Sequence, residues 1–68
     1  MKELKYEIID ELRGKIPAEQ LLEIEKNINE EKYRWAFEDM EKLKSSKQWS
    51  PTQKFLNLLE KFWWEYAN

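Results

Sequence analysis

The chain has 68 residues, a net charge of −2 and neither cysteine nor histidine, so it has room for one domain and cannot form a disulfide. Zinc and iron–sulfur sites are not expected, because those metals prefer thiolate and imidazole ligands. The same absences remove the commonest general base and the strongest nucleophile. We therefore predict that the protein is not an enzyme and holds no cofactor.

The composition favours helix throughout the chain. Lysine, glutamate and leucine dominate, there are one glycine and two prolines, and valine is absent, whereas strands are usually rich in β-branched residues. The sequence has no run of about 18 apolar residues, which a membrane span would need. The acidic N-terminal turns indicate no signal peptide, and the lack of cysteine is typical of a cytoplasmic protein. We expect a single soluble helical domain over residues 1–68.

The first predicted helix runs from about residue 2 to residue 13. Gly14 follows the basic Arg13, which is a common order at the C-terminus of a helix. A second helix is predicted over about 17–28, because Pro17 suits the first helical position. The apolar stripes at helical spacing are Leu4, Ile8, Ile9 and Leu12 in the first helix, and Leu21, Leu22, Ile24 and Ile28 in the second.

The boundary after Ile28 has two interpretations. Asn29 is a good N-cap ahead of two glutamates, and the apolar stripe shifts by roughly 70° between Ile28 and Tyr33 at 100° per residue. These features predict a separate third helix over about 30–44, with a stripe of Tyr33, Ala36, Met40 and Leu43. The alternative is a single bent helix that joins the second and third.

A fourth helix is predicted over about 51–66, with Ser50 as its N-cap and Pro51 as its first residue. It is the most hydrophobic element, so we expect it at the centre of the core. Its stripe is Phe55, Leu58, Leu59, Phe62 and Tyr66. Amphipathic helices joined by short connections are typical of an antiparallel bundle, so the predicted fold class is all-α, a bundle of three to four helices.

Four tryptophans are more than a core of this size needs. By helical spacing, Trp35 lies about 120° and Trp64 about 160° from the middle of the apolar stripe of its own helix, while Trp49 lies in the polar connection. Exposed aromatic residues often anchor protein interfaces, so these three are the predicted protein-binding residues. In the structural alternatives, Trp35 faces another helix, Trp64 folds along its own helix, and Trp49 closes the end of the bundle.

The segment 42–54 contains four lysines and no acidic residue. It could be a solvated turn, or it could contact phosphates as part of a helix-turn-helix, in which the second helix reads base edges. The acidic overall charge argues against the second interpretation. The candidate nucleic-acid-binding residues are Lys42, Lys44, Lys47, Gln53 and Lys54.

The acidic residues give a further alternative, in which they imitate nucleic-acid phosphates and block a basic channel. They are Glu19, Glu23, Glu30, Glu31, Glu38, Asp39 and Glu41. The leading prediction is a small helical interaction protein, which acts as an adaptor, inhibitor or regulatory subunit by binding a larger protein. A self-associating structural protein is another alternative, so the expected partner is a larger protein or further copies of the chain.

Overall fold

Four α-helices and a final π-helical turn make up most of the protein in a computed structural model that describes residues 3–46 and 49–68. The all-α class and the predicted order of helices are confirmed. The elements are α1 (Leu4–Leu12), α2 (Ala18–Asn29), α3 (Tyr33–Leu43), α4 (Gln53–Phe62) and the π-helical turn η1 (Trp63–Ala67). None of the helices in the described part of the chain is both long enough and apolar enough to cross a membrane.

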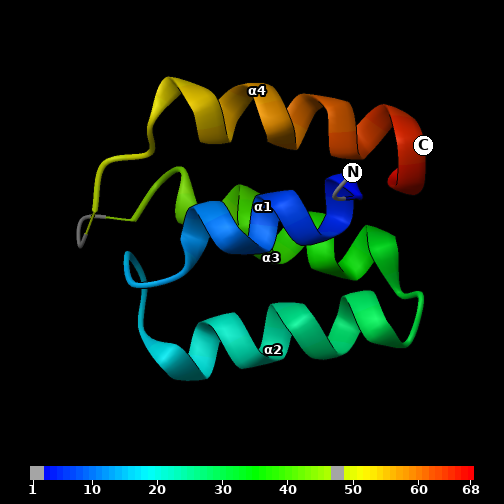
Figure 1. Cartoon of the computed structure of the whole chain (residues 1–68), viewed down its shortest axis with the longest axis horizontal. Helices are drawn as coiled ribbons and strands as arrows, with labels where there is room; N and C mark the ends of the chain where they lie inside the picture. The colour runs from blue at the N-terminus through cyan, green and yellow to red at the C-terminus, as the bar shows by residue number, and fades with distance from the viewer. Residues whose placement is uncertain (1–2, 47–48) are drawn as a thin grey trace.

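The helices form an antiparallel bundle in which consecutive helices run in opposite directions (Figure 1). α1 packs against α2 and α4, and α3 packs against α2, α4 and η1. In the view of Figure 1, α4 lies at the top, α2 at the bottom, and α1 in front of α3 between them. α2 and α4 are therefore on opposite sides of the molecule.

The end of α1 follows from the backbone freedom of Gly14. The N–H of Lys15 donates to the carbonyl of Leu12 at 3.0 Å. Arg13 has φ −62° and ψ 127°, and Gly14 has φ +80°, which are the angles of a type II turn. A Cβ at Gly14 would meet no atom within 4 Å, so glycine is favoured there by its left-handed backbone and not by lack of space.

The turn between α2 and α3 shows that they are separate helices, so the alternative of one bent helix is wrong. Glu31 lies in the left-handed region with φ +62°. Its N–H donates to Ile28 at 3.1 Å, and the N–H of Lys32 donates to Asn27 at 2.8 Å. This pair of bonds is the Schellman motif, which usually has glycine at the left-handed position. The predicted N-cap Asn29 is instead the last residue of α2.

The start of α4 differs from the prediction by two residues. Thr52 is the N-cap, and its hydroxyl oxygen accepts a hydrogen bond from the N–H of Phe55 at 3.1 Å. Ser50 and Pro51 remain in the connection. Both Ser50 and Thr52 are residue types that cap helices. Thr52 is the one that caps α4, and its hydroxyl also donates a hydrogen bond to the carboxylate of Glu11 in α1 at 3.3 Å.

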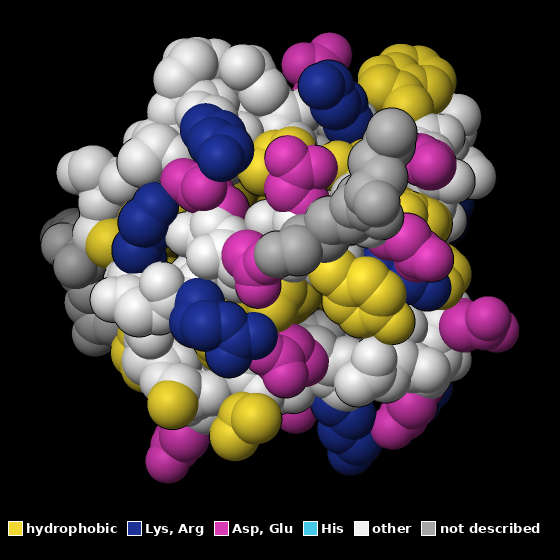
Figure 2. Space-filling model, in the orientation of Figure 1, with side chains coloured by type: hydrophobic (Ala, Val, Ile, Leu, Met, Phe, Trp, Pro, Cys, Tyr) yellow, Lys and Arg dark blue, Asp and Glu magenta, His cyan; other side chains and the backbone are white. Residues whose placement is uncertain are grey.

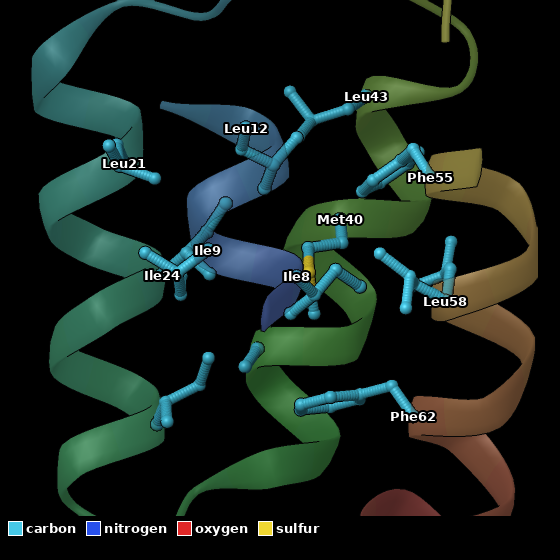
Figure 3. Close-up of a cluster of buried hydrophobic side chains, with 13 residues drawn as sticks. Ile8, Ile9, Leu12, Leu21, Ile24, Met40, Leu43, Phe55, Leu58 and Phe62 are labelled. Carbon is cyan, nitrogen blue, oxygen red and sulfur yellow. The ribbon is translucent and has the colours of Figure 1, made fainter. Parts of the chain in front are cut away.

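The core is a single cluster to which all four helices contribute (Figure 3). The side chains of Ile8 and Met40 lie near its centre, and Phe55 and Phe62 enter it from α4. Both phenylalanines are fully buried, as the predicted stripe of the fourth helix requires, although the centre of the core is formed by Ile8 and Met40 and α4 covers one side of it. The predicted stripe of α2 is wrong at one position, because Leu22 is 63% exposed.

A partly buried polar pair joins α2 to α3. Asn27 is only 7% exposed, and its amide donates to the carboxylate of Asp39 at 3.0 Å. The bond satisfies a group that would be costly to bury alone. It also fixes which side of α3 faces α2, which matters for the position of Trp35.

We expect Glu31→Gly to stabilise the fold. A left-handed backbone costs a non-glycine residue roughly 1–2 kcal/mol, and glycine loses roughly 0.5–1 kcal/mol more chain entropy on folding, so the net gain is up to about 1 kcal/mol. Urea unfolding measures it. Glu31→Ala removes the same charge but keeps the strained backbone, so it should show no such gain, and equal effects of the two variants would contradict the strain account.

Two leucine truncations should separate core from surface. Leu59 is 2% exposed and Leu22 is 63% exposed. We expect Leu59→Ala to lower the free energy of unfolding by about 2–5 kcal/mol and Leu22→Ala by less than about 0.5 kcal/mol. Both values come from chemical denaturation monitored by circular dichroism. A comparable loss in the two variants would mean that Leu22 packs against more of the protein than the structure shows.

Candidate functional site

Two of the three predicted protein-binding tryptophans are exposed to solvent. Trp35 on α3 is 59% exposed and Trp64 in η1 is 65% exposed. Their positions follow from the helix registers, because the opposite faces of α3 and α4 are buried in the core. Neither helix could turn its tryptophan inward without moving core residues into water. Exposed indoles of this size are the residues that most often anchor protein interfaces.

Trp64 stands beside an open depression of about 540 Å³ on the outer side of α4. The residues that line it include two adjacent charges of opposite sign, Glu60 and Lys61. Neither makes an ion pair within the described ranges 3–46 and 49–68, whereas Lys54 on the same helix lies 3.6 Å from Glu11. We call this surface the Trp64 face; it consists of Asn57, Glu60, Lys61, Trp64 and Glu65.

A groove of about 410 Å³ between α3 and α4 adjoins the Trp64 face and shares Glu60 with it. Its aromatic wall is Trp63, whose ring centroid lies 5.0 Å from that of Phe37. The guanidinium of Arg34 lies 5.8 Å from the Trp63 ring and donates to the carbonyl of Ala67 at 3.2 Å. Arg34 therefore fixes η1 against α3 and supports the indole of Trp63.

Trp35 belongs to a different surface. Asp39 lies one turn after it on α3 and contacts Asn27 of α2, so by helical spacing Trp35 lies on the α2 side of α3. The ammonium of Lys32 is 5.1 Å from its ring centroid, and Glu30 holds that ammonium at 3.1 Å. Trp35 thus lies beside α2, whereas Trp64 directly follows α4, and these two helices are on opposite sides of the bundle (Figure 1).

Trp49 is packed more closely than the other two. It is partly buried against the core, and its ring meets that of Phe55 edge to face at 5.4 Å. Its indole N–H is buried and has no hydrogen-bond partner among the described residues. Trp49 thus covers the end of the core near the start of α4 and offers less free surface to a partner.

The described candidate nucleic-acid-binding residues lie at the end of α3 and the start of α4. Lys42, Lys44, Gln53 and Lys54 are exposed, and Lys47 lies outside the described residues. Lys44 is 3.5 Å from Glu41 and Lys54 is 3.6 Å from Glu11. α3 and α4 run antiparallel (Figure 1), whereas the helices of a helix-turn-helix cross at about 90–120°.

The side of the molecule drawn in Figure 2 carries a mixed surface. Acidic and basic side chains alternate over it, and apolar side chains appear between them as separate patches. The described residues contain no group of three or more histidine, cysteine, aspartate or glutamate side chains that could hold a metal ion. Comparisons with protein-family models, curated proteins and solved structures find no match for this chain.

Glu11 gives the junction of α1 and α4 a pH-dependent link. A hydrogen bond from Lys15 at 2.7 Å lowers the pKa of Glu11, and the charge of Lys54 and the hydroxyl of Thr52 add to this. Since the folded pKa is below the unfolded value near 4.5, the stabilisation is full above that value and is lost as pH falls through the folded pKa.

We expect Glu11→Gln to lower the free energy of unfolding at pH 7 and to have a smaller effect at pH 3. Urea unfolding at the two pH values measures the difference. Glu19→Gln removes an exposed carboxylate of α2 and controls for the change in net charge. An effect of Glu11→Gln that does not shrink at low pH would show that the ion pair is not its cause.

Proposed function

We propose that this chain is a small helical interaction protein that acts as an adaptor, inhibitor or regulatory subunit by binding a larger protein. The observation that carries the proposal is the exposure of Trp35 and Trp64, at 59% and 65%. The protein buries its other large aromatic side chains wholly or in part, apart from Tyr6. Its two most exposed aromatic residues are thus both tryptophans.

The two exposed indoles offer a large area that a partner could bury. A tryptophan can bury about 150–250 Å², so an indole that is about 60% exposed has roughly 100 Å² or more left to bury. At about 25 cal/mol per Å², each of the two could contribute roughly 2–4 kcal/mol to binding. A contribution of that size is typical of an interface hot spot.

The basic segment supports the nucleic-acid alternative less well. Two of its exposed lysines, Lys44 and Lys54, already lie beside carboxylates. Phosphate contacts would need those lysines to exchange one partner for another, which weakens the electrostatic gain that dominates such binding. The acidic alternative is similar, because Glu30 and Glu41 are paired with lysines.

The test is capture of a protein from a lysate of the source cells by the tagged chain, followed by titration of that purified protein. We expect Trp35→Ser or Trp64→Ser to weaken its affinity by about 30-fold or more, which corresponds to a hot spot of about 2 kcal/mol. Isothermal titration calorimetry gives the dissociation constants.

Leu22→Ser is the matched control, because Leu22 is 63% exposed and lies on α2. It should leave the affinity within about threefold of the wild type. The proposal fails if both tryptophan variants bind the captured protein as tightly as this control does. It also fails if the captured material is lost on nuclease treatment.

A further inference from the structure

Charge is divided unevenly between the α2–α3 hairpin and the rest of the chain. Residues 17–41, which form the hairpin, contain eight acidic and three basic residues, whereas the rest of the chain contains six acidic and nine basic residues. α2 and α3 pack against each other, so their negative charges act together. The hairpin therefore attracts cationic groups and repels anionic ones.

A groove of about 210 Å³ lies between the two helices of this hairpin. Ile24 and Leu43 form its floor, and their side chains extend into the core (Figure 3). Its charged residues are Glu23 on α2 and Asp39 and Lys42 on α3. The groove thus has one carboxylate from each helix, while its only cation lies in the last turn of α3.

Trp35 stands beside the groove, because it precedes Asp39 by four residues on the same side of α3. Its ring is 59% exposed and already attracts a cation, since the ammonium of Lys32 lies 5.1 Å from the ring centroid. A guanidinium over the open part of this ring would have the Asp39 carboxylate one helical turn away. An arginine can satisfy the ring and the carboxylate together. We call Trp35 and the groove residues the Trp35 groove.

The carboxylates around Trp35 have room for a cation. Within residues 3–46 and 49–68, neither Glu23 nor Glu38, which follows Trp35 by three residues, has an ion-pair partner. Asp39 accepts a hydrogen bond from Asn27 at 3.0 Å. That bond holds the carboxylate in place and leaves it further lone pairs for a second donor.

We propose that the Trp35 groove binds an arginine-rich segment of a larger protein, with one guanidinium over the Trp35 ring and against Asp39. The inference deepens the proposed function and rests on it, because it gives the chemistry of the partner at one of the two exposed tryptophans. Lys42 confines the cationic part of the segment to the end of the groove nearer Trp35, since opposed like charges are unfavourable. Arginine is preferred to lysine, because its planar group stacks on an indole and donates two hydrogen bonds to a carboxylate.

The first experiment compares fluorescently labelled peptides of about ten residues, in which alanine alternates with arginine, lysine or glutamate. Fluorescence anisotropy at about 20 mM salt, with protein added up to about 1 mM, gives the dissociation constants. We expect the arginine peptide to bind, the lysine peptide to bind about threefold more weakly, and the glutamate peptide not to bind. Raising the salt to about 200 mM should weaken the binding of the arginine peptide, because salt screens exposed charges.

The second experiment locates the binding site with variants. Trp35→Ser should bind the arginine peptide about tenfold more weakly than the wild type, while Trp64→Ser, the matched control beside α4, should bind it within about twofold. Glu23→Gln should weaken binding about threefold, and Glu65→Gln, which changes the net charge equally, should weaken it less. Circular dichroism confirms that each variant is folded.

Lys32 gives a variant that should gain affinity. Its ammonium occupies part of the Trp35 ring, so Lys32→Gln removes a cation that competes with the guanidinium of the peptide. We expect Lys32→Gln to bind the arginine peptide about threefold more tightly than the wild type. Lys61→Gln makes the same change in net charge on α4 and should produce a smaller gain.

Nuclear magnetic resonance gives a direct view of the contact through the indole N–H signals. Trp35→Ser identifies the signal of Trp35 by removing it, and Trp64→Ser does the same for Trp64. During a titration with the arginine peptide, the Trp35 signal should shift progressively and the Trp64 signal should stay in place.

The inference is overturned if the arginine peptide does not bind at about 1 mM protein, if the glutamate peptide binds as well, or if Trp64→Ser weakens binding as much as Trp35→Ser. These results leave the proposed function intact, because capture of a larger protein is judged by the separate comparison of Trp35→Ser and Trp64→Ser with Leu22→Ser. Conversely, a chain that binds the arginine peptide at Trp35 but captures no larger protein supports the cation preference of the Trp35 groove and not the proposed function.

Discussion

Burial of the α4 stripe in the shared core is the interaction on which the rest of the structure depends. Phe55 and Phe62 are fully buried, and Leu58 and Leu59 lie between them in contact with the other helices. With no disulfide, apolar burial is the main force that can hold four short helices together. Burying these side chains also sets the rotation of α4 about its own axis, and that rotation places Trp64 in water.

Two turns direct the helices toward this core, and each contains one residue with left-handed backbone angles, although the residue types differ. Gly14 enters the left-handed region without strain, while Glu31 enters it at a cost. The cost at Glu31 is offset by the Schellman hydrogen bonds and by the packing that an antiparallel α2 and α3 allow. A chain that continued as one helix would have avoided this strain, but it could not have directed both Ile28 and Met40 into one core.

Helical periodicity accounts for what could be predicted, and tertiary contacts account for what could not. The stripes of α1, α3 and α4 repeat every three to four residues, so their buried residues follow from spacing alone. Leu22 is exposed, contrary to the prediction, and Asn27 is buried. Spacing could not show this, because α2 packs against both α1 and α3, and the Asp39 carboxylate that receives Asn27 is distant in sequence. The cap at Thr52 depends similarly on Glu11 in α1.

The π-helical turn at η1 is a further feature without a local signal in the sequence. In a regular α-helix Ala67 would lie roughly 120° from Phe55 around the axis, yet it is buried. The wider turn, closed by a hydrogen bond from the N–H of Asn68 to the carbonyl of Trp63 at 2.7 Å, rotates Ala67 inward. Its carbonyl then meets Arg34 of α3, a contact that local spacing cannot reveal.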